Sequence, residues 1–176
     1  RVESLNVSSI VKGIAKTFVE MAKSRNITFL SKIPEQVMWN SDKGFLNTII
    51  INLISNAFKY TPDGQSIKIE VDTSRENMLA LRVANEGSTI KEKDFQYIFN
   101  RYAILDNFEN QDEKNFSRNG LGLAISYNMA KLLNGTLKVE NTPDGWVMFT
   151  LTLPVVKLTT GVSETKRLTA EYIPKI

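Results

Sequence analysis

The stretch Asn52-Leu53-Ile54-Ser55-Asn56-Ala57-Phe58-Lys59-Tyr60 decides how the rest of the chain is interpreted. Apolar residues recur through it at helical spacing, which predicts a buried helix that ends before Thr61. Asn52, Asn56 and Lys59 stand at i, i+4 and i+7, so two carboxamides and one ammonium group share one stripe beside the apolar face. Carboxamide oxygens can ligate a hard divalent cation and an ammonium group can contact phosphate oxygens, so the stripe suits a metal-bound polyphosphate. For this segment alone, a helix with a solvated polar side remains the alternative.

The composition limits the possible chemistry. The chain has 176 residues and a net charge of +3, which fits one globular domain and does not argue for nucleic acid or a membrane surface as a partner. It contains no cysteine and no histidine, so disulfides, thiolate chemistry, the commonest general base and the usual zinc ligand are excluded. No apolar run approaches the roughly 18 residues of a membrane span, and no signal peptide opens the chain. We therefore expect a soluble, cytoplasmic domain, cut from a longer protein.

A second motif, Asn119-Gly120-Leu121-Gly122-Leu123, follows a long polar stretch at 103–119. A structureless stretch of that length in a compact domain is typical of a lid or a disordered segment. The pattern predicts that a helix begins at Leu121, with both glycines at its start. There, backbone N–H groups and the helix dipole can hold an anion, and Arg118 adds a positive charge. A loop-to-helix junction that needs glycine for packing is the alternative. The spacing matches neither a P-loop nor a dinucleotide fingerprint.

The rest of the pattern predicts helices and paired strands. We expect a helix over 10–22 capped by Ser8 or Ser9, a cap at Asp42 for the asparagine-bearing helix, and a short helix from Thr89 to Phe99. After Pro154 the periodicity fades, which indicates a linker or extension. Strands are predicted at 5–7, 27–33, 37–39, 66–73, 78–84, 136–140 and 146–153. This order favours an α+β two-layer sandwich of mostly antiparallel sheet with helices on one face.

Together the two motifs resemble the ATP-binding catalytic domain of sensor histidine kinases, within the superfamily of gyrase, mismatch-repair and heat-shock chaperone ATPases. The resemblance runs from Leu5 to Pro154. It implies the Bergerat fold, a mixed, mostly antiparallel sheet with helices on one face and an ATP lid, here 103–119. It also implies a catalytic domain at 1–154, in which residues 1–8 form a linker from a missing dimerisation domain. Residues 155–176 would form a C-terminal extension.

The resemblance assigns roles to the asparagine-bearing helix. Asn56 would coordinate the Mg²⁺ that bridges the ATP phosphates, and Asn52 would assist it as a second metal ligand. Lys59 would contact phosphate and act with Asn56 in catalysis, while Tyr60 would flank the nucleotide. Asn52 stands where the ATPases of the superfamily carry a glutamate that activates water. An amide cannot take a proton, so this position favours transfer to a histidine, whose neutral imidazole is already a nucleophile.

Two glycine-containing motifs would hold the rest of the nucleotide. Asn85 and Gly87 would bind adenine, but Asn85 replaces an aspartate, so its contact lacks charge assistance. Thr89 replaces a further glycine of that motif. Phe99 and Tyr102 would pack under the lid rather than take part in chemistry. The phosphate-binding set would be Arg118, which replaces a glycine, with Asn119, Gly120, Leu121, Gly122 and Leu123.

The predicted function is therefore the catalytic and ATP-binding part of a two-component sensor histidine kinase. It would bind Mg-ATP and transfer the γ-phosphoryl group to a histidine on a separate dimerisation domain that precedes Arg1. The parent would be a homodimer that signals to a response regulator, and this domain would contact neither nucleic acid nor membrane. Whether the parent is membrane-anchored stays open. The alternatives are a degenerate nucleotide-binding relay module without turnover, which the changes at Asn85, Thr89 and Arg118 favour, and an independent ATPase.

Overall fold

A five-stranded mixed sheet forms the centre of the computed structural model, which describes residues 1–87, 89–100, 113–160 and 168–172, with only the backbone described for 113–121, 159–160 and 168–172. β2 pairs with β4 in parallel, and the other neighbouring strands are antiparallel. The predicted two-layer α+β architecture is confirmed. The strand order is β2 (Thr28–Lys32), β4 (Ser66–Asp72), β5 (Met78–Glu86), β7 (Trp146–Pro154) and β6 (Thr136–Asn141).

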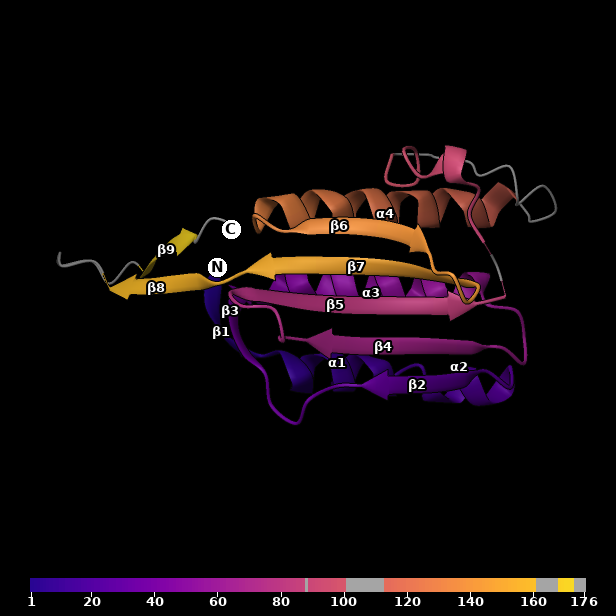
Figure 1. Ribbon diagram of the computed structural model, residues 1–176, viewed down its shortest axis with the longest axis horizontal. Helices are drawn as coiled ribbons and strands as arrows, with labels where there is room; N and C mark the ends of the chain where they lie inside the picture. Colours follow the sequence, from indigo (N-terminus) through magenta and orange to yellow (C-terminus); the bar gives the residue numbers. More distant parts are fainter. Residues whose placement is uncertain (88, 101–112, 161–167, 173–176) are drawn as a thin grey trace.

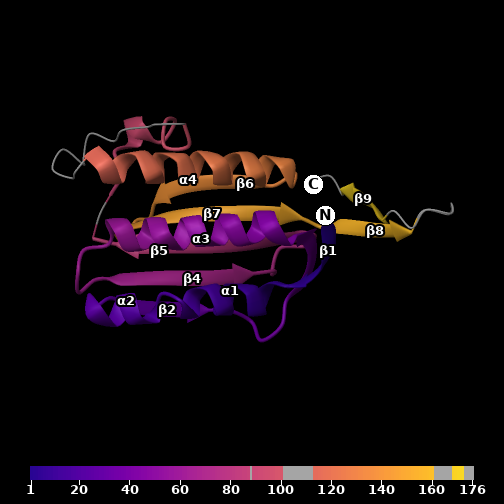
Figure 2. The ribbon, with the colours of Figure 1, turned by 180° about the vertical axis from the view of Figure 1, so that it is seen from behind.

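Helices cover one face of this sheet, and the other face is open (Figure 1). From behind, α1 (Val7–Lys16), α3 (Lys43–Tyr60) and α4 (Glu113–Leu132) lie in front of the strands (Figure 2). The short α2 (Val19–Ser24) packs at the β2 edge. The core lies between the two layers, because the strands alternate and send every second side chain toward the helices. Its fully buried members include Leu46, Ile49, Ile50 and Leu53 of α3 and Leu79, Leu81 and Val83 of β5.

The open face of the sheet carries charged side chains in cross-strand contact. Arg82 of β5 lies between two carboxylates of β4, with its Nη1 3.6 Å from an oxygen of Glu70 and 3.1 Å from an oxygen of Asp72. The Lys32 ammonium lies 3.8 Å from Glu70. Opposite charges on neighbouring strands stabilise the strand pairing.

Two small sheets lie at one end of the molecule (Figure 1). β1 (Val2–Asn6) pairs with β3 (Met38–Asp42), and β8 (Val156–Thr160) pairs with β9 (Leu168–Tyr172), both antiparallel. Residues 1–8 comprise β1 and the start of α1, and Leu5 and Val7 are buried in the core. That this segment connects to a further domain remains a prediction. After Pro154, where the sequence pattern indicated a linker or extension, the described residues form the paired strands β8 and β9.

Side chains of β3 tie this hairpin to the rest of the fold. Trp39 Nε1 donates to the carbonyl of Pro154 over 3.1 Å, and Asn40 Nδ2 donates to the carbonyl of Val156 over 2.7 Å. Since these bonds join residues more than a hundred positions apart, the sequence pattern gave no sign of them.

The first predicted helix is divided in two. α1 begins at Val7, and its N-cap is Asn6, whose Oδ1 accepts from Ser9 N over 3.2 Å, so the predicted serine caps are wrong. α1 ends at Lys16, where the Thr17 hydroxyl donates to the carbonyl of Ile14 over 2.7 Å and competes with the helix ladder. No helix among the described residues is long and apolar enough to cross a membrane.

The prediction of a short helix from Thr89 to Phe99 is also wrong. Only η1 (Glu92–Asp94), a single 3₁₀ turn, forms there, and its N-cap residue Lys91 makes no side-chain capping bond. The segment is held instead by Asn141, which accepts from Ile90 N over 3.1 Å and donates to Ile90 O over 2.7 Å.

Candidate functional site

The asparagine-bearing helix is fixed at both ends. At its start, Asp42 Oδ1 accepts from Phe45 N over 3.0 Å, as the capping pattern predicted. At its end, the guanidinium of Arg25 donates to the carbonyls of Phe58 and Thr61, the latter over 2.5 Å. Its Nε donates to Asp63 over 2.7 Å. A cation that bonds the last carbonyls of a helix also complements its dipole, so Arg25 holds the turn that carries Lys59 and Tyr60.

The side chain of Asn56 has a buried oxygen without a partner among the described residues. The residue is 6% exposed, and its Oδ1 accepts no hydrogen bond from any described group. A buried carbonyl oxygen left without a partner costs about 1–3 kcal/mol, so such an atom in a native fold calls for an explanation. A bound hard cation would supply what is missing, because neutral carboxamide oxygens are among its ligands. The side chain therefore fits the Mg²⁺ implied for this position.

Asn52 joins the two predicted motifs. Its Nδ2 donates to the carbonyl of Gly122 over 3.1 Å and to the hydroxyl of Ser126 over 3.0 Å. Gly122 packs against the same carboxamide, because a Cβ built there would lie 3.5 Å from Asn52 Cγ. The structure therefore brings the asparagine stripe of α3 into direct contact with the glycine motif on α4.

Lys59 and Tyr60 form the last turn of α3. The Lys59 ammonium lies 5.3 Å from the centre of the Tyr60 ring, within the range of a cation–π contact. Partial burial lowers the pKa of Lys59, because removal from water disfavours its charged form. Burial raises the pKa of the Tyr60 phenol for the same reason. An ammonium that has lost part of its hydration gains from an anionic partner such as phosphate.

The end of β5 lies against the turn that follows α3. Asn85 is 2% exposed and pairs with Ile67 of β4 and Val147 of β7. Gly87 has a φ of 85°, and a Cβ built on it would lie 3.0 Å from Pro62 Cδ. A side chain at this position would be strained by the positive φ and would crowd Pro62, so glycine is favoured here. The predicted adenine motif thus lies at the same end of the fold as the last turn of α3.

The glycine motif differs from its predicted geometry. α4 begins at Glu113 rather than at Leu121, so Gly120 and Gly122 lie inside the helix and not at its start. Backbone N–H groups inside a helix are bonded to carbonyls one turn earlier, so in this conformation they do not form an anion-binding nest. Residues 113–119 of the predicted lid are helical, and 101–112 lie outside the described residues.

Of the other residues predicted for the site or for packing beneath the lid, the structure describes the side chains of some and not of others. Leu123 is 7% exposed and belongs to the core, which makes it a packing residue in this structure. Phe99 packs on Tyr127 with ring centres 5.1 Å apart, in keeping with its predicted packing role. The side chains of Arg118, Asn119 and Leu121, as well as all of Tyr102, lie outside the described part of the chain.

Three residues of this region were missed in the sequence. Ser126 could have been suspected, because it is a polar residue one helical turn after Gly122 among apolar neighbours. No local signal marks Arg25 or Asn141, because the partners of both are distant in sequence. Their roles depend on tertiary contacts.

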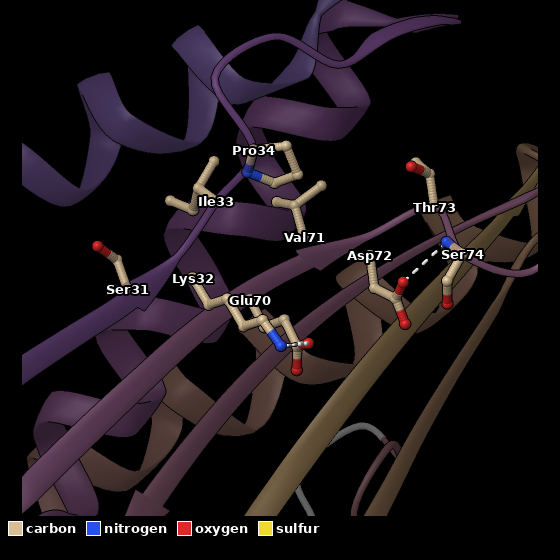
Figure 3. Close-up of a pocket in the computed structure, with 9 residues that line it drawn as sticks. All are labelled: Ser31, Lys32, Ile33, Pro34, Glu70, Val71, Asp72, Thr73 and Ser74. Carbon is tan, nitrogen blue, oxygen red and sulfur yellow. Dashed lines mark hydrogen bonds and ion pairs between the residues drawn. The ribbon is translucent and has the colours of Figure 1, made fainter.

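A separate pocket of about 770 Å³ lies where β2 and β4 end (Figure 3). This is the end of the sheet opposite to Asn85. Lys32 is paired with Glu70 at its rim, and Asp72 accepts from the backbone of Ser74 over 2.8 Å. The two carboxylates disfavour a polyphosphate there. This pocket is therefore distinct from the region around Asn56.

Comparison with known proteins agrees with the fold and the motifs. Residues 41–157 match the family described as histidine kinase-, DNA gyrase B-, and HSP90-like ATPase. The sensor histidine kinase TmoS of Ectopseudomonas mendocina is 31% identical over 150 residues, which is 85% of this chain but only 15% of that protein. The chain thus spans a small part of the curated relative.

Solved structures resemble the fold. The nucleotide-free catalytic domain of histidine kinase ThkA superposes with a TM-score of 0.76 at 22% identity, covering 88% of this chain and 96% of that one. Full-length ShkA in complex with AMPPNP gives a TM-score of 0.71 at 18% identity, covering 88% of this chain and 31% of that one. ThkA has also been solved in complex with response regulator protein TrrA.

The fold and the family match together define an ATPase domain of the Bergerat type. The chain belongs to the histidine kinase-, DNA gyrase B-, and HSP90-like ATPase family.

Proposed function

We propose that this chain is the catalytic and ATP-binding domain of a sensor histidine kinase, binding Mg-ATP and transferring the γ-phosphoryl group to a histidine on a separate domain. The observation that carries the proposal is the buried oxygen of Asn56, which no described group bonds, on a helix in contact with the glycine motif. A relative named as a sensor histidine kinase supports the choice of acceptor.

The asparagine stripe would hold the metal and the phosphates. Asn56 Oδ1 would ligate Mg²⁺, with the oxygen of Asn52 as a second ligand one turn away. When bound, the ion neutralises charge on the transferring phosphoryl group. The ammonium of Lys59 would contact a phosphate oxygen, and its partial burial strengthens that attraction. These side chains contribute positioning and charge rather than proton transfer, since an amide cannot act as a general base.

The adenosine end would lie beyond the last turn of α3. The side-chain carbonyl of Asn85 would accept a hydrogen from the adenine amino group, Gly87 would let the backbone approach the base, and Tyr60 would flank it. The triphosphate would be closed in by Arg118, Asn119, Gly120, Leu121 and Gly122, and by the backbone of Leu123, whose side chain packs in the core. For Gly120 and Gly122 this requires the start of α4 to leave the helical conformation, because their N–H groups are otherwise used within the helix.

The parent protein would be a homodimer whose dimerisation domain carries the acceptor histidine. Its phosphoryl group would pass to a response regulator, and the solved complex of ThkA with TrrA provides a parallel. The proposed location is cytoplasmic, without contact to nucleic acid or membrane by this domain.

Nucleotide binding is the first test. Isothermal titration calorimetry of the 176-residue chain with Mg-ATP should detect binding, and Asn56→Ala should weaken it at least about tenfold, the upper end of what one ordinary hydrogen bond provides. Asn47→Ala is the matched control, since Asn47 lies on α3 nine residues from Asn56, roughly half a turn around the helix axis. We expect it to bind as the wild type does. No heat of binding at millimolar ATP would contradict the proposal.

Turnover is the second test. The chain alone should release negligible phosphate, because it contains no histidine and Asn52 cannot activate water. Joined to a helical dimerisation domain with an acceptor histidine, it should form acid-labile phosphohistidine. Binding without transfer would favour the relay module, and rapid phosphate release without an acceptor would favour an independent ATPase.

A further inference from the structure

Ser126 is a buried polar residue of α4 for which neither the sequence motifs nor the comparisons give a role. It is 0% exposed, and its hydroxyl accepts from Asn52 Nδ2 over 3.0 Å. The second hydrogen of the same amide goes to the carbonyl of Gly122, 3.1 Å from the nitrogen. An amide nitrogen carries two hydrogens, so Asn52 has no donor left for a ligand.

These partners also fix the orientation of the Asn52 side chain. A backbone carbonyl can only accept, so the NH₂ end must face Gly122 and the oxygen must point elsewhere. Ser126 supplies the second contact, without which the carboxamide could rotate about the bond to its Cβ. Asn52 can therefore offer a bound species one atom only, its carbonyl oxygen, and Ser126 helps to hold that atom in place.

We propose that Ser126 is a positioning residue for the metal–nucleotide site, acting through Asn52 by holding its carbonyl oxygen available to the cation of a Mg–ATP complex. This inference rests on the proposed function, because it needs a metal-bound nucleotide beside α3. Ser126 does not touch the nucleotide itself. Its loss should therefore affect the part of nucleotide affinity that depends on the cation, and leave the cation-independent part intact.

The test is calorimetric titration of ATP in saturating Mg²⁺ and in EDTA, for wild type and Ser126→Ala. We expect the Mg²⁺-dependent affinity to fall about fivefold, as for the loss of one hydrogen bond, and the affinity in EDTA to stay within about twofold. Ser8→Ala is the matched control, because Ser8 is also 0% exposed but its hydroxyl has no partner among the described groups. We expect it to keep both affinities.

A second variant covers the case in which Ser126→Ala does not fold. Ser126→Cys nearly preserves volume but provides a poor acceptor, so it should show the same Mg²⁺-specific loss. Wild-type Mg²⁺ dependence in a folded Ser126 variant, or equal losses with and without Mg²⁺, would overturn the inference alone. A wild-type chain that does not bind Mg-ATP would overturn the proposed function and the inference with it.

Discussion

At the scale of single residues, the two asparagines of α3 differ in what their side chains can still bind. Both amide hydrogens of Asn52 are used by α4. The oxygen of Asn56, one turn further along, is buried and has no hydrogen-bond partner in the part of the chain that the structure describes. Asn52, whose amide hydrogens are bonded, is suited to hold a fixed side-chain orientation, whereas the buried oxygen of Asn56 would gain more from a ligand. The stripe that looks uniform in sequence thus contains one anchored and one unsatisfied carboxamide.

Asp72 gives the fold a contribution that depends on pH. Hydrogen bonds from Ser74 and then from Arg82 lower the pKa of Asp72 from 3.8 to about 2. Because the folded pKa lies below the unfolded one, the stabilisation is complete above an unfolded pKa of about 3.8 and is lost as pH falls toward about 2. Urea unfolding of wild type and Asp72→Asn should show a constant difference in free energy from neutral pH down to about pH 5.

Below that range the difference between the two proteins should shrink, since wild-type Asp72 becomes protonated. Ser74→Ala should reduce the pH-dependent part, because it removes the hydroxyl that lowers the pKa of Asp72. A difference that does not change down to about pH 2, the folded pKa of Asp72, would contradict this account.

At the scale of secondary-structure elements, the end of α3 depends on Arg25. Arg25→Ala should lower the free energy of unfolding by about 1–3 kcal/mol, because two helix carbonyls lose charged donors. Arg25→Lys should recover only part of this, since an ammonium group cannot reproduce the planar fork. Chemical denaturation measures both. Lys23→Ala is the control, because the Lys23 ammonium forms an exposed pair with Glu20 at 3.5 Å, and the loss of such a pair should change stability little.

α4 contains glycine where a helix would prefer another residue. Gly122→Ala should raise the free energy of unfolding by about 0.5–1 kcal/mol without ligand, because the built Cβ meets Asn52 at ordinary contact distance. If the nucleotide needs this backbone out of the helix, the same change should weaken Mg-ATP binding. Thermal unfolding with and without Mg-ATP separates the two effects. Compared with the wild type, we expect Gly122→Ala to have a higher Tm without ligand and a smaller increase in Tm when Mg-ATP is added. A larger ligand-induced rise than wild type would count against the proposed phosphate role of the motif.

Elements were predictable from sequence where several local signals agree. α3 has apolar periodicity, a capping Asp42 and a following Pro62, and its bounds match the prediction. The central strands alternate and are separated by turn residues such as Gly145, which has a φ of 87°. α4 was predicted to start too late because Gly120 and Gly122 are poor helix formers. Its 20-residue length shows that this propensity was overridden.

The candidate site was also predictable only where local spacing determines it. Helical spacing alone places Asn52 and Asn56 together, whereas their contact with α4 depends on how two distant helices pack. The bonds made by Arg25 and Ser126 are also tertiary, so residue identity could not reveal them. The β8–β9 hairpin went unrecognised because its short strands carry too few alternating residues to stand out from a linker.

At the scale of the whole molecule, the proposed site and the β1–β3 and β8–β9 sheets lie at opposite ends of the central sheet (Figure 1). Asn85 and the last turn of α3 are at one end, and the bonds from Trp39 and Asn40 to the strands around Pro154 are at the other. Charged pairs on the open face and apolar packing on the helix face run between them.

The only two tryptophans of the chain happen to sample both ends. Trp39 is bonded to the carbonyl of Pro154, while Trp146 lies under the ammonium of Lys68, 4.0 Å from its ring centre, and pairs with Glu86. Trp39→Phe retains only Trp146, and Trp146→Phe retains only Trp39. Tryptophan fluorescence of the two variants during denaturation therefore reports on the two ends of the fold separately. Because Pro154 belongs to the same strand as Trp146, both emissions should change at one midpoint. Separate midpoints would mean that the end with the β8–β9 sheet unfolds independently of the end that holds Trp146 and Asn85.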